Sequence, residues 1–134
     1  MGKLFILIAE DDIADGHYAL SALQKTNKFN KIVLVNNAQE AITYLSKSDQ
    51  LPDIILSDLM MPKYNGFDLY KKLKKIDRFA NIPFVIYTDI LSDSDMVNAS
   101  ELGIDVLQKP LDISEYSILC NTLSNYANSY LGIS

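Results

Sequence analysis

Polar residues that could carry chemistry follow four of the short apolar runs in the sequence. They are Glu10-Asp11-Asp12 after residues 4–9, Ser57-Asp58 after 54–56, Thr88-Asp89 after 84–87, and Gln108-Lys109-Pro110 after 106–107. Three clustered carboxylates repel one another unless a cation neutralises them, and Mg²⁺ with oxygen ligands suits such a set. Lys109 would add a permanent positive charge, and Thr88 a neutral hydroxyl donor. An aspartate in those surroundings is equipped to accept a phosphoryl group as an acyl phosphate.

The elements that must position these residues alternate in type along the chain. Apolar runs without alternation, at 4–9, 32–35, 54–56, 84–87 and 106–107, are typical of strands buried on both faces. Helical spacing of apolar residues follows each run, in segments that begin near 13, 38, 67, 92 and 113. Five strand–helix units predict an α/β fold, (βα)5, with helices on both faces of one parallel sheet. Ligands bind beyond the carboxyl ends of such strands, so Glu10, Asp11 and Asp58 meet there if their strands are neighbours.

The composition is that of one globular domain. The chain has 134 residues, of which 49% are hydrophobic and 22% charged, and the pattern fills residues 1–134, which predicts one domain without an attached effector. A net charge of −5 disfavours direct binding to nucleic acid or to an anionic membrane. A single cysteine and a single histidine exclude an internal disulfide and a histidine metal cluster. With acids ending the first apolar run, we expect no signal peptide and a cytoplasmic protein.

The order of these residues resembles that of the receiver domain of two-component response regulators. The resemblance covers essentially the whole chain, and it rests on the motifs at 6–12 and 53–62, Asn65-Gly66, Tyr87-Thr88 and Lys109-Pro110. It implies a flavodoxin-like three-layer sandwich whose five parallel strands lie in the order 2-1-3-4-5.

The resemblance also implies a metal site beside a phosphoacceptor. Asp58 would be the residue that takes the phosphoryl group and would also bind the metal. Asp11 would bind Mg²⁺ directly, Glu10 would bind it through water, and the main-chain carbonyl of Met60 would complete the protein ligands.

Two further positions of the family motif are filled, and two are unusual. Thr88 would hydrogen-bond the phosphoryl group, Lys109 would pair with a phosphoryl oxygen, and the bond from Lys109 to Pro110 is expected to be cis. Val106 stands where receiver domains often carry an aromatic residue that moves on activation, so that switch is absent or relocated. Asp89 stands where a small residue is more usual, and its charge should slow small anionic phosphodonors.

By this resemblance the chain is a signalling domain and not an enzyme. A sensor histidine kinase or histidine phosphotransfer protein would supply the phosphoryl group, docking on the first helix and the loops around it. A downstream protein target, or a second copy of the chain, would bind the face made by the fourth helix, fifth strand and fifth helix.

Three other functions are open at this stage, and each makes a different demand on the sequence. A degenerate receiver would act without phosphorylation, and the unusual Val106 keeps that reading open. An aspartate-nucleophile phosphohydrolase needs a second acid two residues after the nucleophile, where this chain has Met60. A flavin binder needs a phosphate loop after the first strand, where residues 10–12 are acidic.

Overall fold

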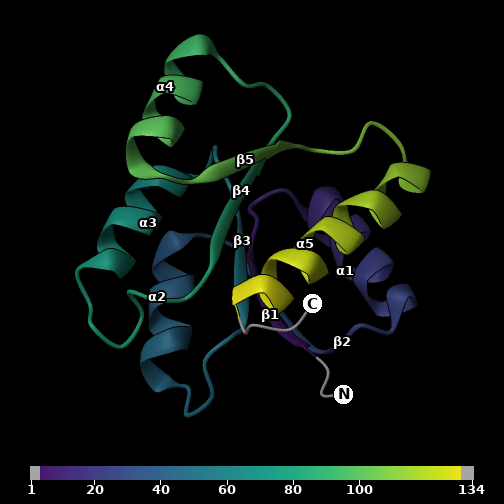
Figure 1. Cartoon of the computed structure of the whole chain (residues 1–134), viewed down its shortest axis with the longest axis horizontal. Helices are drawn as coiled ribbons and strands as arrows, with labels where there is room; N and C mark the ends of the chain where they lie inside the picture. The colour runs from purple at the N-terminus through teal and green to yellow at the C-terminus, as the bar shows by residue number, and fades with distance from the viewer. Residues whose placement is uncertain (1–3, 131–134) are drawn as a thin grey trace.

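The computed structural model describes residues 4–130 and shows the predicted alternation of strands and helices (Figure 1). Its elements are β1 (Leu4–Ala9), α1 (Ile13–Thr26), β2 (Phe29–Val35), α2 (Ala38–Lys47), β3 (Ile54–Asp58), α3 (Gly66–Lys74), β4 (Phe84–Thr88), α4 (Asp93–Leu102), β5 (Asp105–Gln108), the 3₁₀ turn η1 (Ile113–Glu115) and α5 (Tyr116–Tyr130). All neighbouring strands pair in parallel, in the order β2-β1-β3-β4-β5. The predicted α/β fold and strand order are confirmed.

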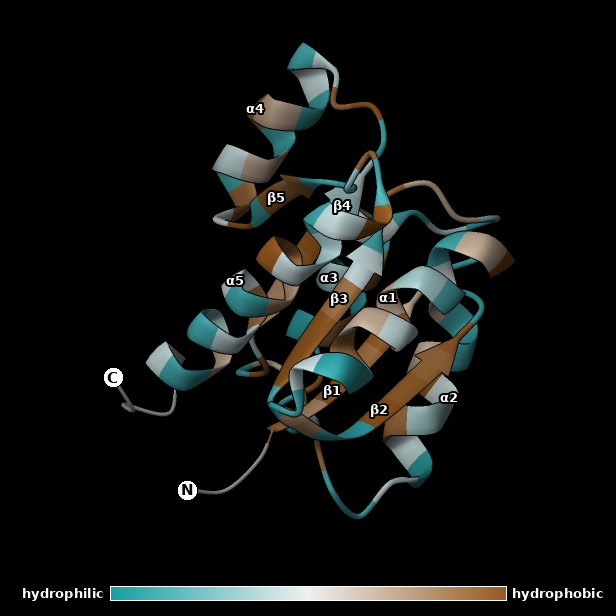
Figure 2. Ribbon diagram, turned by 90° about the vertical axis from the view of Figure 1, so that its right-hand side faces the viewer, coloured by the Kyte–Doolittle hydropathy of each residue, from teal (hydrophilic) through white to brown (hydrophobic). Residues whose placement is uncertain are grey.

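The sheet lies between two layers of helices. Helices α1 and α5 cover one face, and α2, α3 and α4 cover the other (Figure 1). The central strands β1 and β3 are buried along their whole length, whereas the edge strands β2 and β5 are partly exposed. In Figure 2 the strands are the most hydrophobic segments of the ribbon. Burial on both faces explains why the strand runs are continuous and not alternating.

Successive residues of β1 supply two separate cores. Ile6 and Ile8 join the core beneath α1 and α5, while Leu7 and Ala9 join the core beneath α2 and α3. This division follows from the period of two along a strand, which sends neighbouring side chains to opposite faces. Since both faces are fully packed, the end of β1 is held firmly in place, and with it the acidic residues that follow.

Three helix starts and one helix end agree with the capping signals in the sequence. The Asp12 carboxylate accepts a hydrogen bond from the main-chain nitrogen of Asp15 at 2.9 Å and so caps the start of α1, a role that aspartate commonly takes. Asn65 and Ser92 each form a capping box at the start of α3 and α4. Gly103 ends α4 with φ of 72°, a left-handed conformation that glycine adopts readily at a helix end.

Several local predictions differ from the structure. Strand β2 begins at Phe29 and not at residue 32, because polar side chains are tolerated at the sheet edge. Ile13 begins the predicted helical spacing of apolar residues, but it is 77% exposed because it lies at the first position of α1, beyond the last strand residue. Residues 113–115 form a 3₁₀ turn before α5. The predicted cis bond between Lys109 and Pro110 is wrong: within residues 4–130 every peptide bond is trans.

None of the helices in the described part of the chain combines the length and the hydropathy needed to cross a lipid bilayer.

Candidate functional site

Three carboxylates meet at the carboxyl edge of the two central strands. Glu10 and Asp11 follow β1, Asp58 ends β3, and these strands are direct neighbours in the sheet. One carboxylate oxygen of each residue lies within 4.8 Å of the other two. Glu10 and Asp58 are buried, whereas Asp11 is exposed. The structure therefore brings together the three acids that the strand pattern placed at one edge.

Lys109 enters this cluster from the end of β5. Its Nζ lies 2.9 Å from Glu10 Oε1, 2.9 Å from Asp15 Oδ2 and 3.4 Å from Asp58 Oδ1. The lysine side chain is only 4% exposed. A buried ammonium is stable when carboxylates surround it, and here three carboxylates offset its desolvation.

Glu10 is held from three sides. Its Oε1 accepts a hydrogen bond of 2.6 Å from the hydroxyl of Tyr87 and also pairs with Lys109, while its Oε2 accepts from the main-chain nitrogen of Asp12 at 3.1 Å. Tyr87 is fully buried, and burial together with the neighbouring Glu10 charge raises its pKa strongly. The tyrosine therefore stays protonated and donates to the carboxylate.

The remaining predicted site residues lie around Asp58. The main-chain nitrogen of Met60 donates to Asp58 Oδ1 at 3.3 Å, so this turn folds back over the carboxylate. Thr88 is buried at the end of β4, and its hydroxyl donates to the main-chain oxygen of Ile90 at 3.1 Å. Gly66 lies so close that a Cβ there would be 2.8 Å from the Asp58 carbonyl oxygen.

Burial sets the protonation of Asp58. Burial, followed by the hydrogen bond and charge of Glu10, raises the pKa of Asp58 to about 8, although Lys109 acts in the opposite direction. For Lys109 burial alone would lower the pKa, but its hydrogen bonds to Asp15 and Glu10 raise it overall. The crowding of carboxylates thus favours binding of a positive species, either a proton or a dication.

A cleft of about 470 Å³ opens from the cluster to solvent. It is lined by Asp11, Asp12, Asp15, Asp58, Met60, Thr88, Asp89, Ile90, Asp95 and Lys109. Six of these residues are acids and one is a lysine, so the mouth of the cleft is strongly negative. Five of the six predicted site residues line it directly, and the sixth, Glu10, lies buried beneath.

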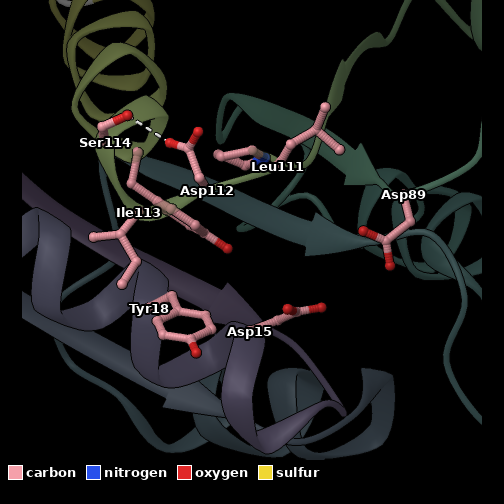
Figure 3. Close-up of a pocket in the computed structure, with 9 residues that line it drawn as sticks. Asp15, Tyr18, Asp89, Leu111, Asp112, Ile113 and Ser114 are labelled. Atoms are coloured by element: carbon pink, nitrogen blue, oxygen red, sulfur yellow. Dashed lines mark hydrogen bonds between the residues drawn. The ribbon is translucent and has the colours of Figure 1, made fainter.

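A second cavity, of about 670 Å³, adjoins this cleft between α1 and the segment that joins β5 to α5. Figure 3 shows Asp15 and Tyr18 on α1 facing Ile113 and Asp112 from the opposite side. Leu111 and Ile113 are 83% and 65% exposed. The surface beside the acidic cleft therefore combines apolar side chains with carboxylates.

Two residues that contact this site, Asp15 and Tyr87, were not predicted as site residues from the sequence. Asp15 lies in the first turn of α1, three positions after the N-cap Asp12, so its place at the start of that helix could have put it near the site. Tyr87 belongs to a buried strand, and its hydroxyl reaches Glu10 across the sheet edge. Nothing in the sequence alone indicates that contact.

The arrangement is that of a known family. The family model of the response regulator receiver domain matches residues 6–119. The chain belongs to this family. Receiver domains are signalling domains that interact with histidine kinases or phosphotransfer proteins, and they generally bind Mg²⁺ at an acidic site.

Individual relatives agree with this assignment. The two-component response regulator ORR3 of Oryza sativa is 32% identical over 117 residues, which are 87% of each chain. Response regulator Rre1 of Synechocystis sp. is 30% identical over 119 residues, which are 88% of this chain and 50% of Rre1. This receiver domain thus spans about half the length of Rre1. The prediction that it has no attached effector stays a prediction.

A solved structure shows the same fold. The phosphorylated cyanobacterial phytochrome response regulator RcpA superimposes with a TM-score of 0.80 at 24% identity, over 97% of this chain and 95% of RcpA.

Val106, which stands where receiver domains often carry an aromatic residue, is half-buried and packs against the core beneath α3 and α4. That the aromatic switch of the family is absent or relocated here stays a prediction.

Proposed function

We propose that this receiver domain takes a phosphoryl group on Asp58 from a sensor histidine kinase or histidine phosphotransfer protein, and then signals through protein contacts. The observation that carries the proposal is the meeting of Glu10, Asp11 and Asp58 within 4.8 Å of one another, with Lys109 among them. Four residues from three separate parts of the chain supply the charges that an acyl phosphate needs. That complete set also argues against a degenerate receiver.

The transfer is a substitution at phosphorus. An oxygen of the Asp58 carboxylate attacks the phosphorus atom of a phosphohistidine, a new oxygen–phosphorus bond forms, and the nitrogen–phosphorus bond breaks to release imidazole. Lys109 pairs with a phosphoryl oxygen and offsets its charge. Thr88, whose hydroxyl now donates to Ile90, turns to donate to the phosphoryl group instead.

The acidic residues fit a bound Mg²⁺. Asp11 and Asp58 would bind the ion directly, Glu10 through water, and the main-chain carbonyl of Met60 would add a neutral oxygen. Such hard oxygen donors are the ligands that Mg²⁺ takes in proteins. When bound, the ion would neutralise charge on the phosphoryl oxygens. The position of Glu10 agrees with an indirect role, since both of its oxygens already accept hydrogen bonds or an ion pair.

The phosphodonor would dock on α1 and the β5–α5 segment. That surface surrounds the acidic cleft, and it presents exposed apolar side chains at Ile13, Leu111 and Ile113. An apolar centre beside charged groups is the usual composition of a transient interface. The α4–β5–α5 face would bind the downstream target or a second copy, and Met96 and Val97 are exposed on α4.

The proposal is tested by intact-mass measurement after incubation with acetyl phosphate and Mg²⁺. We expect wild type to gain the mass of one phosphoryl group, and Asp58→Asn to gain none. Asp89→Asn is the matched control, because it removes a carboxylate from the same cleft but leaves the cluster intact. Labelling of Asp58→Asn, or no labelling of wild type by acetyl phosphate or by a phosphorylated phosphotransfer protein, would contradict the proposal.

A further inference from the structure

Lys109 is shared between the acceptor aspartate and helix α1. Its Nζ donates a hydrogen bond of 2.9 Å to Asp15 Oδ2, in the first turn of α1, and lies 3.4 Å from Asp58 Oδ1. The ammonium therefore sits half an ångström closer to the helix than to the acceptor. Asp15 is no part of the three-carboxylate cluster, so the cluster alone does not explain this position.

Competition for the ammonium follows from its small number of donors. A lysine ammonium has three N–H groups, and Glu10, Asp15 and Asp58 lie around them. A phosphoryl group on Asp58 adds oxygens that need a charge-assisted hydrogen bond from the same ammonium. Glu10 is fixed by Tyr87 and by the Asp12 main chain, whereas the Asp15 side chain is 26% exposed and can turn to water. Of these carboxylates, Asp15 is therefore the one from which Lys109 separates at the smallest cost in free energy.

We propose that Asp15 is a positioning residue that holds Lys109 toward α1 and competes with the phosphoryl group for it. The phosphorylated state is then less stable than it would be without Asp15. On phosphorylation Lys109 leaves Asp15 for the phosphoryl oxygen, and the freed carboxylate lies at the edge of the cavity beside α1. This inference rests on the proposed function of Asp58.

The test measures binding of beryllofluoride, a stable analogue of the phosphoryl group, to metal-loaded protein by fluorine NMR. We expect Asp15→Asn to lower the dissociation constant about fivefold, because a competing charge-assisted hydrogen bond is lost. Asp15→Glu keeps a carboxylate in reach of Lys109 and should stay close to wild type.

Asp12→Asn is the matched control for charge. Asp12 lines the same cleft and lies at the start of the same helix, and asparagine caps a helix as well as aspartate does. Its carboxylate accepts a hydrogen bond from the main-chain nitrogen of Asp15 and makes no ion pair with Lys109. We expect this variant to change the dissociation constant less than about twofold, since exposed charges interact weakly through water.

A second measurement follows Lys109 itself in the absence of metal and beryllofluoride. The carbon NMR signal of its ε-methylene group, assigned with Lys109→Arg, should shift in Asp15→Asn and stay in place in Asp12→Asn. Equal gains in beryllofluoride affinity for the two variants, or weaker binding by Asp15→Asn, would overturn the inference and leave the function of Asp58 intact. Failure of wild type to bind beryllofluoride, matched by Asp58→Asn, would overturn both.

Discussion

The two halves of the carboxyl edge of the sheet are built differently. On the β1–β3 side each strand residue is buried, and the carboxylates of Glu10 and Asp58 accept hydrogen bonds. On the β4–α4 side Ala99 alone among the α4 residues is buried, and Ile90, Met96 and Val97 are 80%, 55% and 55% exposed. A region with few buried contacts can rearrange at small cost in free energy. The three carboxylates thus lie on the closely packed β1–β3 half, the rigid half, and the adjoining half is the one able to move.

The largest difference between the halves should appear in stability. Ile8 of β1 is fully buried, and Ile8→Ala should lower the free energy of unfolding by about 3–4 kcal/mol, because it leaves a cavity in a packed core. Val97→Ala on α4 removes an exposed side chain and should change it by less than about 0.5 kcal/mol. Urea denaturation followed by circular dichroism measures both values. Similar losses for the two variants would mean that α4 is packed as firmly as β1.

Substitution of one glycine in each half should have smaller effects on stability, and only one of the two should affect Mg²⁺ binding. At Gly66 a Cβ would lie 2.8 Å from the Asp58 carbonyl oxygen, so Gly66→Ala must displace main chain. We expect it to cost about 2 kcal/mol and to weaken Mg²⁺ binding, measured by calorimetry. Gly103 ends α4 with φ of 72° and has open space around it. Gly103→Ala should cost about 1 kcal/mol from backbone strain and leave Mg²⁺ affinity unchanged. If both variants weaken Mg²⁺ binding, the packing of the β4–α4 half affects the metal site on the other half.

The rigid half is also the half that the sequence predicts best. A buried parallel strand needs a continuous apolar run, so β1, β3 and the polar residues that follow them can be located directly from residue types. The strand order then brings Glu10, Asp11 and Asp58 together without any further information. Edge strands are harder, because one side of them is exposed and polar residues are tolerated. That is why the start of β2 at Phe29 was missed.

Contacts between side chains from different elements could not be predicted in this way. The Tyr87 hydroxyl reaches Glu10, and Asp15 reaches Lys109, across gaps that depend on how α1 and the strands are placed in three dimensions. Residue type and spacing indicate which edge of the sheet a side chain lies near. They do not show which partner that side chain contacts.

On the β4 side, Asp89 offers a kinetic test. It lines the cleft mouth, and its charge should repel incoming acetyl phosphate. Asp89→Ala should raise the initial rate of labelling about threefold at low salt, and the gain should shrink as salt screens the charge. Intact mass against time gives the rates. Asp93→Ala is the control, since Asp93 is exposed at the start of α4 and does not line the cleft. Rapid labelling of wild type that Asp89→Ala leaves unchanged would show that Asp89 does not screen the site.

The smallest expected effect concerns Cys120, whose reactivity reports how well the core beneath the rigid half excludes water. It lies on α5 in the core beneath β1 and β3, where burial, opposed by the Lys28 charge, raises its pKa to about 11. Iodoacetamide reacts with the thiolate, so native protein at pH 8 should be alkylated far more slowly than urea-unfolded protein. Mass spectrometry against time measures both rates.

The same pKa sets a dependence of stability on pH. The unfolded thiol loses its proton near pH 9 and the folded thiol near pH 11, so the free energy of unfolding should fall across this interval and stay unaffected by this group below it. Cys120→Ala lacks that component, and the difference between the two pH profiles isolates it from tyrosine and lysine titration. Equal profiles, together with fast alkylation of native protein, would mean that water reaches Cys120 and that the core behind the acidic cluster opens as readily as the α4 side.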